Sequence, residues 1–248
     1  MTITTFKRYE KKFMLSEFQY QAILPGLMQY MRPDEHCQEG HEYTIYNIYY
    51  DTDDSSIIRH SLSKPYYKEK LRLRSYSIPT SPNSKVFLEL KKKLGGVVNK
   101  RRAVLTLGEA YQFLEKGTPP KNMDYMNKQV LNETAFYLMN HDVNPTTYIS
   151  YKRTALFGKY DSDFRITFDR NIITRREELT LEKGRFGEDL LGPGKYLMEV
   201  KVSSAFPVWL ANLLSENQIY KTSFSKYGME YTKNLLRQKQ VCSLQKAV

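Results

Sequence analysis

The chain has 248 residues, and its 38 Lys and Arg against 27 Asp and Glu give a formal net charge of +11. This excess predicts an anionic partner, such as nucleic acid, a membrane surface or a phosphorylated small molecule. Hydrophobic residues make up 41% of the chain, which supports a packed core and argues against wholesale disorder. The 20 Tyr and 12 Phe residues favour strands.

Cysteine and histidine give no sign of a metal or redox centre. Cys37 and Cys242 lie far apart without a CxxC spacing, so a structural zinc site or a disulfide framework is not expected. The four histidines are scattered and show no ligand spacing. The N-terminus lacks an apolar signal core, and no run approaches the roughly 18 apolar residues of a membrane span. We therefore expect a cytoplasmic protein with no membrane segment in this chain.

The elements predicted in chain order alternate strands with a few helices. Strands are expected over residues 6–13, 43–50, 66–78, 87–93, 97–107, 146–157, 164–170 and 196–203, with further short strand in the turn-rich stretch 175–194. The first helix begins at Ser16, with Pro25 expected to bend it or end it early. Other helices are expected over 56–60, 108–117, 122–140 and 205–219, with a last one ending near Gln238. No linker divides the chain, so we expect a single α+β domain over residues 1–248, compatible with a closed antiparallel barrel.

Charges recur at alternate positions of five predicted strands, where successive side chains point to opposite faces. The sets are Glu10 with Lys12, Arg72 with Arg74, Glu89 with Lys91, Arg165 with Thr167 and Asp169, and Glu199 with Lys201. The opposite positions are apolar, as in Leu71 and Leu73. A single such strand is explained by a solvated polar face.

Five such strands together point to a different arrangement. If the helices cover the apolar faces, the charged faces point towards one another and enclose Arg, Lys and a few carboxylates. Buried like charge is costly unless an anion or a metal neutralises it. A chain of linked phosphates gripped by Arg and Lys fits this requirement, with a divalent metal held by carboxylate oxygens.

Other functional signatures are absent from the sequence. Gly187 and Gly192 have the spacing of a P-loop, but Pro193 stands where lysine is required. There is no GxGxxG opening a helix and no Gly-x-Ser-x-Gly elbow. Basic residues interleaved with Tyr suit nucleic acid, yet the recurring Glu would repel its phosphates unless a metal intervened. We therefore expect no nucleic-acid partner.

At this point an ordered set of motifs resembles a known family. The motifs are Arg8 to Phe13, Tyr49 to Thr52, Lys70 to Tyr76, Glu89 to Lys91, Lys100 to Arg102, Tyr151 to Ala155, Arg165 to Arg170, Met198 to Lys201 and Phe224 to Tyr227. Together they resemble the VTC domain, the polyphosphate polymerase branch of the triphosphate tunnel metalloenzymes. The resemblance spans about residues 6 to 232.

The resemblance implies an eight-stranded antiparallel tunnel, with helices outside, that binds ATP, another nucleoside triphosphate or polyphosphate together with Mn²⁺ or Mg²⁺. By matching motif, the phosphate-binding residues would be Lys12, Arg72, Arg74, Lys91, Arg102, Arg153, Arg165, Lys201 and Lys226. Lys12, Arg72, Arg74, Lys91 and Glu199 would be the catalytic set. Glu199 would be the main metal ligand, supported by Glu10 and Glu89.

Two points of the resemblance depart from the family or stay open. Arg8 replaces the first Glu of the Glu-x-Glu-x-Lys run that often begins the wider superfamily, which fits a VTC-like site better than a hydrolase of the CYTH type. The register around Lys100, Arg101 and Arg102 does not show which of them faces inward.

The leading hypothesis is transfer of the terminal phosphate of ATP to a growing polyphosphate chain. An inorganic or nucleoside triphosphatase on the same scaffold is the second, because only the acceptor differs. A non-catalytic module that binds polyphosphate or nucleotides, and a general nucleic-acid binder, are the remaining alternatives.

Overall fold

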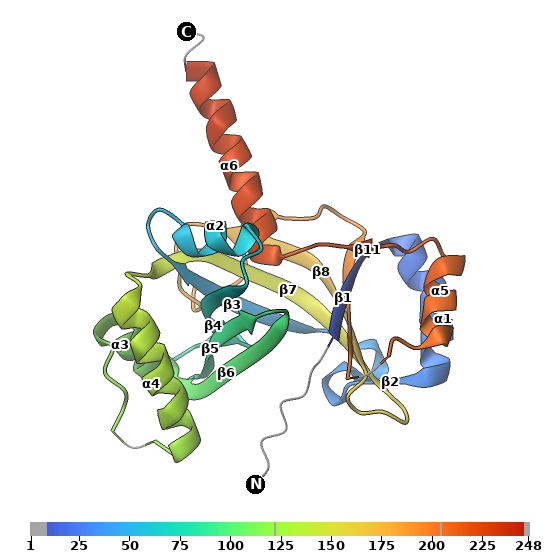
Figure 1. Cartoon of the computed structure of the whole chain (residues 1–248), viewed down its shortest axis with the longest axis horizontal. Helices are drawn as coiled ribbons and strands as arrows, with labels where there is room; N and C mark the ends of the chain where they lie inside the picture. The colour runs from blue at the N-terminus through green and yellow to red at the C-terminus, as the bar shows by residue number, and fades with distance from the viewer. Residues whose placement is uncertain (1–8, 122, 204, 246–248) are drawn as a thin grey trace. The chain divides into compact units, whose positions relative to one another are not determined.

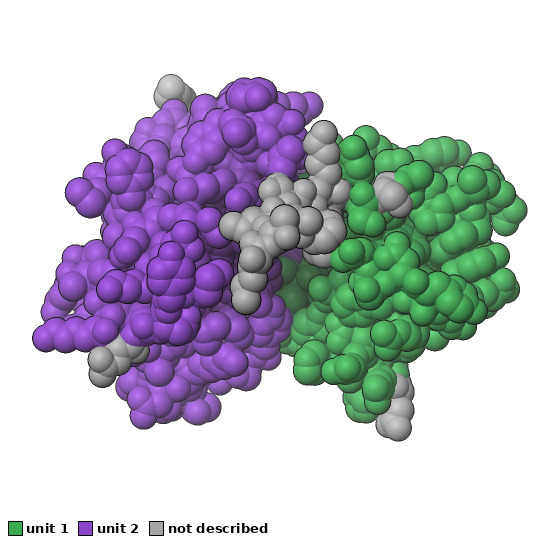
Figure 2. Space-filling view, turned by 60° about the horizontal axis from the view of Figure 1, so that its bottom comes forward, with its two compact units in different colours: residues 1–45, 150–172, 191–224 green, residues 46–149, 173–190, 225–248 purple. Residues whose placement is uncertain are grey.

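The structure is a computed structural model that describes residues 9–121, 123–203 and 205–245. The chain divides into two compact units, each discontinuous in sequence, which are coloured separately in Figure 2. Unit 1 takes in residues 1–45, 150–172 and 191–224, and unit 2 takes in residues 46–149, 173–190 and 225–248. Arg8, the first residue of the motifs that carry the family resemblance, lies outside the described residues.

Three long strands run from one unit into the other: β3 (Tyr43–Asp51), β7 (Asn144–Gly158) and β8 (Arg165–Arg175). The other elements belong to one unit each. Unit 1 holds β1 (Tyr9–Ser16), α1 (Glu17–Tyr30), β2 (Met31–Pro33), η1 (Glu35–Gly40), β10 (Lys195–Val202), α5 (Val208–Glu216) and β11 (Lys221–Thr222). Unit 2 holds α2 (Ser56–Leu62), β4 (Tyr67–Ser75), β5 (Lys85–Leu94), β6 (Val97–Thr106), α3 (Leu107–Lys116), α4 (Tyr125–Asn140), β9 (Glu188–Asp189) and α6 (Lys226–Gln245).

The strands form a mixed helix and antiparallel sheet fold, as the α+β prediction required. The hydrogen-bonded order is β11-β1-β10-β8-β7-β3-β4-β5-β6, with β2 beside β7 and β9 beside β8. The prediction of eight strands was wrong, because the described chain contains eleven. The additional strands β2, β9 and β11 have only two or three residues. β9 falls in the stretch 175–194, where short strand was expected, whereas β2 and β11 are too short for a period-2 pattern to appear in the sequence.

The expected closed barrel was also wrong, since the described strands form an open path that ends at β11 and β6. The outer edge of β6 is instead met by helix α4. The Val104 backbone N–H donates a hydrogen bond to Asn127 Oδ1 on α4, at 2.8 Å. An edge that is covered by a helix in this way cannot pair with a further strand at that point.

Helices cover the apolar face of the sheet within each unit. In unit 2, Leu71, Leu73, Leu88 and Leu90 pack in one cluster with side chains of α3 and α4, the two helices beside β6 in Figure 1. In unit 1, apolar side chains of β1, β8 and β10 pack with those of α1 and α5. The charged residues at alternate positions therefore lie on the face of each unit's sheet that is turned away from these helices.

Capping residues fix where the first and third helices begin. Ser16 and Gln19 form a capping box at the start of α1, and Thr106 and Glu109 form one at the start of α3. Helix α1 continues past Pro25 to Tyr30, so the early end that was one of the two outcomes expected at Pro25 does not occur. Ile23 and Leu27 on either side of Pro25 are fully buried. This packing stabilises the helix although Pro25 has no backbone N–H to donate.

Candidate functional site

Unit 2 carries a row of polar side chains that crosses four neighbouring strands. The backbone register places Tyr49 of β3 opposite Arg72 of β4, Arg72 opposite Glu89 of β5, and Glu89 opposite Arg102 of β6. Directly opposed residues point to the same face of a sheet. The sequence pattern thus brings Arg72, Glu89 and Arg102 together, although they are distant along the chain.

Glu89 is the centre of this row, and it is only 1% exposed. Arg72 Nε donates to its Oε2 at 2.7 Å, and Arg102 Nε donates to its Oε1 at 2.7 Å. Arg74 and Lys100 approach the carboxylate to 3.8 and 3.6 Å. Burial raises the pKa of Glu89, but these four cations outweigh burial and hold the pKa well below its ordinary value.

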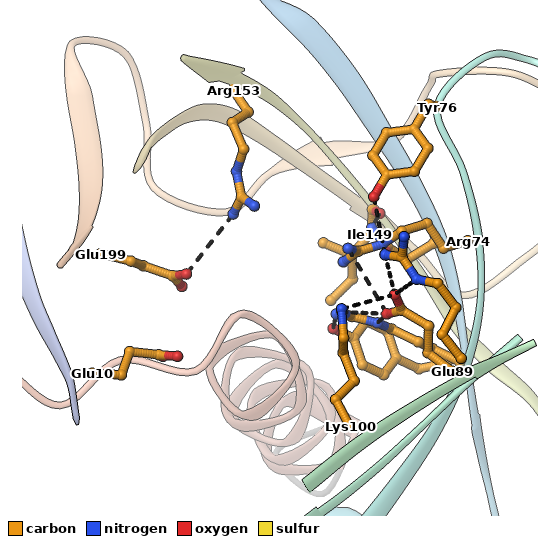
Figure 3. A network of polar contacts seen from close by, with 12 residues as sticks. Glu10, Arg74, Tyr76, Glu89, Lys100, Ile149, Arg153 and Glu199 are labelled. Atoms are coloured by element: carbon orange, nitrogen blue, oxygen red, sulfur yellow. Dashed lines mark hydrogen bonds and ion pairs between the residues drawn. The ribbon is translucent and has the colours of Figure 1, made fainter. Parts of the chain in front are cut away.

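Four cations around one carboxylate leave an excess of three positive charges at Glu89. Figure 3 shows Arg74, Lys100 and Tyr76 gathered around Glu89. Such an excess beside a buried carboxylate is stabilised by a bound anion. Arginine is well suited to that anion being a phosphate, because its planar fork matches phosphate oxygens.

The structure resolves which residues of β6 share this face. Lys100 and Arg102 pair with Glu89. Arg101 points to the opposite face, where its guanidinium pairs with Glu133 of α4 at 3.0 Å. Lys91 of β5 lies between Lys70 of β4 and Lys100 of β6 in the backbone register, so it continues the basic face one row away from Glu89.

Two residues that the sequence analysis gave no role hold the arginines in place. Asn47 Oδ1 accepts a hydrogen bond from Arg74 Nε at 2.9 Å, and Asn47 Nδ2 donates to the Ile149 carbonyl at 2.8 Å. Tyr49 Oη accepts from Arg72 at 3.0 Å. Asn47 and Tyr49 occupy alternate positions of β3 together with Asp51. This alternation is the sequence signal that could have identified them as residues of the polar face.

Unit 1 carries two further rows of charged and polar residues across β1, β10 and β8. One row is Lys12, Glu199 and Thr167, and the next is Glu10, Lys201 and Arg165. Lys12 Nζ lies 3.2 Å from Glu199 Oε1 and 3.3 Å from Glu10 Oε1, and it donates to the Phe224 carbonyl at 3.0 Å. Two of the three Glu-x-Lys pairs therefore lie in unit 1, and Glu89 with Lys91 lies in unit 2.

Arg153 of β7 completes the unit 1 group. Its guanidinium makes a bidentate pair with the buried Asp169, at 2.6 and 2.7 Å. A third contact reaches Glu199 Oε2 at 3.8 Å, drawn as the dashed line between Arg153 and Glu199 in Figure 3. Asp169 was not assigned a role from the sequence, and here it fixes the orientation of Arg153.

The remaining predicted residues lie further from these contacts. Arg165 donates to Asp34 and Tyr43 at 3.5 and 3.3 Å, so its guanidinium is directed towards η1 and the start of β3. Lys201 Nζ is 4.0 Å from Glu10 Oε2. Lys226 is the buried first residue of α6 in unit 2.

The family of the chain follows from the comparison with protein families. The profile of the VTC domain matches residues 7–234. The chain belongs to the VTC domain family. This confirms the family named by the resemblance, while the polyphosphate polymerase branch within it is not distinguished by the match.

Solved structures share the fold at low sequence identity. A Bacillus halodurans chain described as a candidate adenylate cyclase gives a TM-score of 0.54 at 15% identity, covering 88% of this VTC domain chain and 95% of its own. A Hippeastrum chain described as a candidate adenylyl cyclase with a dominant triphosphatase activity gives 0.48 at 16% identity, covering 90% and 95%. The first likeness shows a common fold, and the second is too weak to carry an argument. No match was found among curated proteins.

The fit of a divalent metal to this VTC domain rests on its oxygen donors. The described residues contain no group of three or more Asp, Glu, His or Cys able to hold a metal ion. Glu10 and Glu199 offer carboxylates on either side of Lys12. The buried Thr167 hydroxyl, opposite Glu199 in the register, has no hydrogen-bond partner in the described part of the chain.

This set of donors fits a cation that is held jointly by one or two carboxylates and by substrate phosphates, as Mg²⁺ commonly is. Glu89 fits the metal role less well, because guanidinium groups already bind both of its oxygens. Across residues 9–121, 123–203 and 205–245, no helix is long and apolar enough to cross a membrane.

Proposed function

We propose that this VTC domain transfers the terminal phosphate of ATP to a polyphosphate chain, with Mn²⁺ or Mg²⁺ as cofactor. The observation that carries the proposal is the excess of positive charge around the buried carboxylate of Glu89. A phosphate chain spreads its negative charge over many oxygens, and forked guanidinium groups bind such oxygens with good geometry. Arg72, Arg74 and Arg102 are the leading phosphate-binding residues, because each already contacts the carboxylate of Glu89.

The proposed chemistry requires positioning and charge stabilisation rather than a covalent nucleophile. Phosphoryl transfer proceeds through a transition state whose charge is spread over the transferred oxygens. Arginine and lysine side chains held rigidly by Asn47, Asp169 and Glu89 would meet that charge without reorganising. A bound divalent metal would neutralise charge on the phosphates, and Glu199 with Glu10 would hold it. The other phosphate-binding residues proposed are Lys12, Lys91, Arg153, Arg165, Lys201 and Lys226.

Triphosphate hydrolysis on the same scaffold is the second candidate function. The same cations and carboxylates would serve it, because the two reactions differ only in whether water or a phosphate chain accepts the transferred group. The products distinguish the two reactions.

The experiment is incubation of the purified chain with ATP and Mn²⁺ or Mg²⁺, followed by electrophoresis of the phosphate products. The proposal predicts ADP together with polyphosphate long enough to resolve as a ladder. Orthophosphate with no longer product would establish the triphosphatase instead. Binding of polyphosphate without any metal-dependent turnover would contradict both enzymes and leave a binding module.

The two faces of β6 offer an internal control for the phosphate-binding assignment. Arg102→Gln is expected to weaken metal-free binding of tripolyphosphate about 10-fold, since it removes a charge-assisted hydrogen bond. Arg101→Gln removes the same charge one residue away but on the face that packs against α4, so binding is expected to stay within about twofold. Titration calorimetry at constant ionic strength measures both. Equal losses would mean that only the net charge matters.

A further inference from the structure

Tyr49 occupies the first position of the row that crosses unit 2, beside Arg72 and in line with Glu89 and Arg102. Its side chain is on the charged face and is only 8% exposed. The neighbouring Tyr50 points to the other face and belongs to the apolar core cluster. Tyr49 therefore lies among the cations while Tyr50, one residue away, does not.

The hydrogen bond between Arg72 and Tyr49 does not use the hydroxyl hydrogen of Tyr49. A guanidinium can only donate, so in the 3.0 Å contact with Arg72 the Tyr49 oxygen is the acceptor. The hydroxyl hydrogen of Tyr49 must then find another acceptor. Among the described residues, the Tyr49 hydroxyl accepts from Arg72 and donates to no other group. A largely buried donor without a partner is costly, and it points to an acceptor that comes from outside the chain.

The ring of Tyr49 is held so that this donor has a fixed position. It stacks on Tyr227 with a centroid distance of 4.7 Å and an interplanar angle of 24°. The Tyr227 hydroxyl is itself 2.7 Å from Asp51 Oδ2, to which it donates. The Tyr49 carbonyl accepts from Thr146 Oγ1 at 3.2 Å. Backbone, ring and hydroxyl are thus each fixed by separate contacts.

We propose that the Tyr49 hydroxyl donates a hydrogen bond to a phosphate oxygen of the linked-phosphate substrate that Arg72 binds. The inference rests on the proposed function, and it assigns Tyr49 as a further substrate-contacting residue. Arg72 would hold the phosphate by charge, and Tyr49 would add a neutral donor whose oxygen Arg72 already orients. A phosphate oxygen is a strong acceptor, so the pair suits it better than a neutral ligand.

Ionisation of Tyr49 gives this role a pH dependence. Burial raises the pKa of Tyr49, but Arg72, Arg74 and Lys70 of β4 together with the hydrogen bond from Arg72 outweigh burial and lower the pKa to about 8. The protonated phenol donates, so its contribution is present below pH 8 and is lost as the pH rises through that value. Above it, the phenolate would repel phosphate.

Other groups near Tyr49 must be separated from this effect. Lys100 has a pKa of about 8, lowered by burial although Glu89 opposes the shift, and it also loses positive charge above that pH. Tyr227 of α6 has its pKa raised, mainly by burial. Asp51 lies on β3 itself, and Glu89 lies further along the row. All of these groups remain in a Tyr49 variant, so a ratio of affinities between the wild type and that variant isolates Tyr49.

The test is titration calorimetry of tripolyphosphate, without metal and at constant ionic strength, into the wild type, Tyr49→Phe and Tyr50→Phe at pH 6.5 and pH 9.5. At pH 6.5, Tyr49→Phe is expected to bind about 10-fold more weakly than the wild type. At pH 9.5 the ratio is expected to fall to about 1 or below, because the wild-type phenol has ionised. Tyr50→Phe makes the same chemical change on the core face, and it is expected to match the wild type at both pH values.

Each other outcome overturns a defined part of the account. A Tyr49→Phe protein that matches the wild type at pH 6.5 would overturn the donor role of Tyr49 while the proposed function stands. A 10-fold loss that persists unchanged at pH 9.5 would also overturn it, since a purely structural role of the ring or of Arg72 orientation does not titrate with the phenol. A wild type that does not bind tripolyphosphate at all would overturn the proposed function itself.

Discussion

Replacing Glu199 by glutamine is expected to lower metal-dependent turnover of ATP by on the order of 10²-fold or more. Glutamine keeps the shape of the side chain but removes the charge that a divalent cation requires. Metal-free binding of tripolyphosphate is expected to hold or to strengthen, because Lys12 and Arg153 lose an anionic partner at 3.2 and 3.8 Å. Steady-state kinetics and metal-free calorimetry on the same protein measure the two effects.

A matched control is available in the same unit. Glu42 makes a bidentate pair with Arg170 at 2.6 and 2.7 Å, and it is not part of the Glu10, Lys12 and Glu199 group. Glu42→Gln is expected to leave turnover within about twofold. Glu199→Gln with normal turnover would remove the residue from the metal site. Loss of binding and turnover together would show that Glu199 only supports the fold.

Replacing Glu89 by glutamine is expected to destabilise the protein by about 3–5 kcal/mol, because the arginines around it keep their charge but lose their buried partner. Glu133→Gln is the matched control: it removes a carboxylate that pairs with Lys92 and Arg101 on the other face of the same sheet. Its side chain is 27% exposed against 1% for Glu89, so the cost is expected to be below about 1 kcal/mol. Urea unfolding of the three proteins measures the difference.

Tripolyphosphate is expected to recover a larger share of stability in Glu89→Gln than in the wild type, since a bound anion replaces the missing carboxylate. A Glu89→Gln protein as stable as the wild type would contradict the neutralising role of Glu89. If Mg²⁺ alone raised the unfolding free energy of the wild type but not that of Glu89→Gln, Glu89 would be a metal ligand.

The stability that Glu89 provides depends on pH in a defined direction. Its pKa in the folded protein is held well below the ordinary value, and an unfolded glutamate titrates at about 4.3. A depressed folded pKa contributes stability that is complete above the unfolded pKa and is lost as the pH falls towards the folded one. The gap in unfolding free energy between the wild type and Glu89→Gln should therefore be constant from about pH 5.5 to 7 and narrow below about pH 4.5.

Alternation along single strands was enough to predict the long strands and the side that helices cover. Leu71 and Leu73 opposite Arg72 and Arg74 show one face for the core and one for charge, and the structure places the leucines in the core cluster. Short strands such as β11, with two residues, have no such pattern. The prediction of a closed barrel failed for a different reason. Closure requires a strand to pair with the outer edge of β6, and a helix contacts that edge through Asn127.

The partners within the candidate site could not be predicted, because they depend on strand register. Glu-x-Lys looks the same in β5 and β10, yet the register places Glu89 between Arg72 and Arg102 and places Glu199 between Lys12 and Thr167. A slip of one residue would exchange these neighbours for core residues. For the same reason the sequence left open which of Lys100, Arg101 and Arg102 faces inward. In the structure, Arg101 lies on the face opposite Glu89, where it pairs with Glu133 of α4.

The most direct test of the account is the binding of tripolyphosphate to the wild type and to Arg72→Ala in about 150 mM salt, with duplex DNA as the comparison ligand. We predict saturable binding of tripolyphosphate that Arg72→Ala weakens by on the order of 10- to 100-fold, and DNA binding that is weak and falls steeply with salt. Tripolyphosphate that binds no better than DNA, or that binds Arg72→Ala as well as the wild type, would contradict the claim that these charged faces recognise linked phosphates.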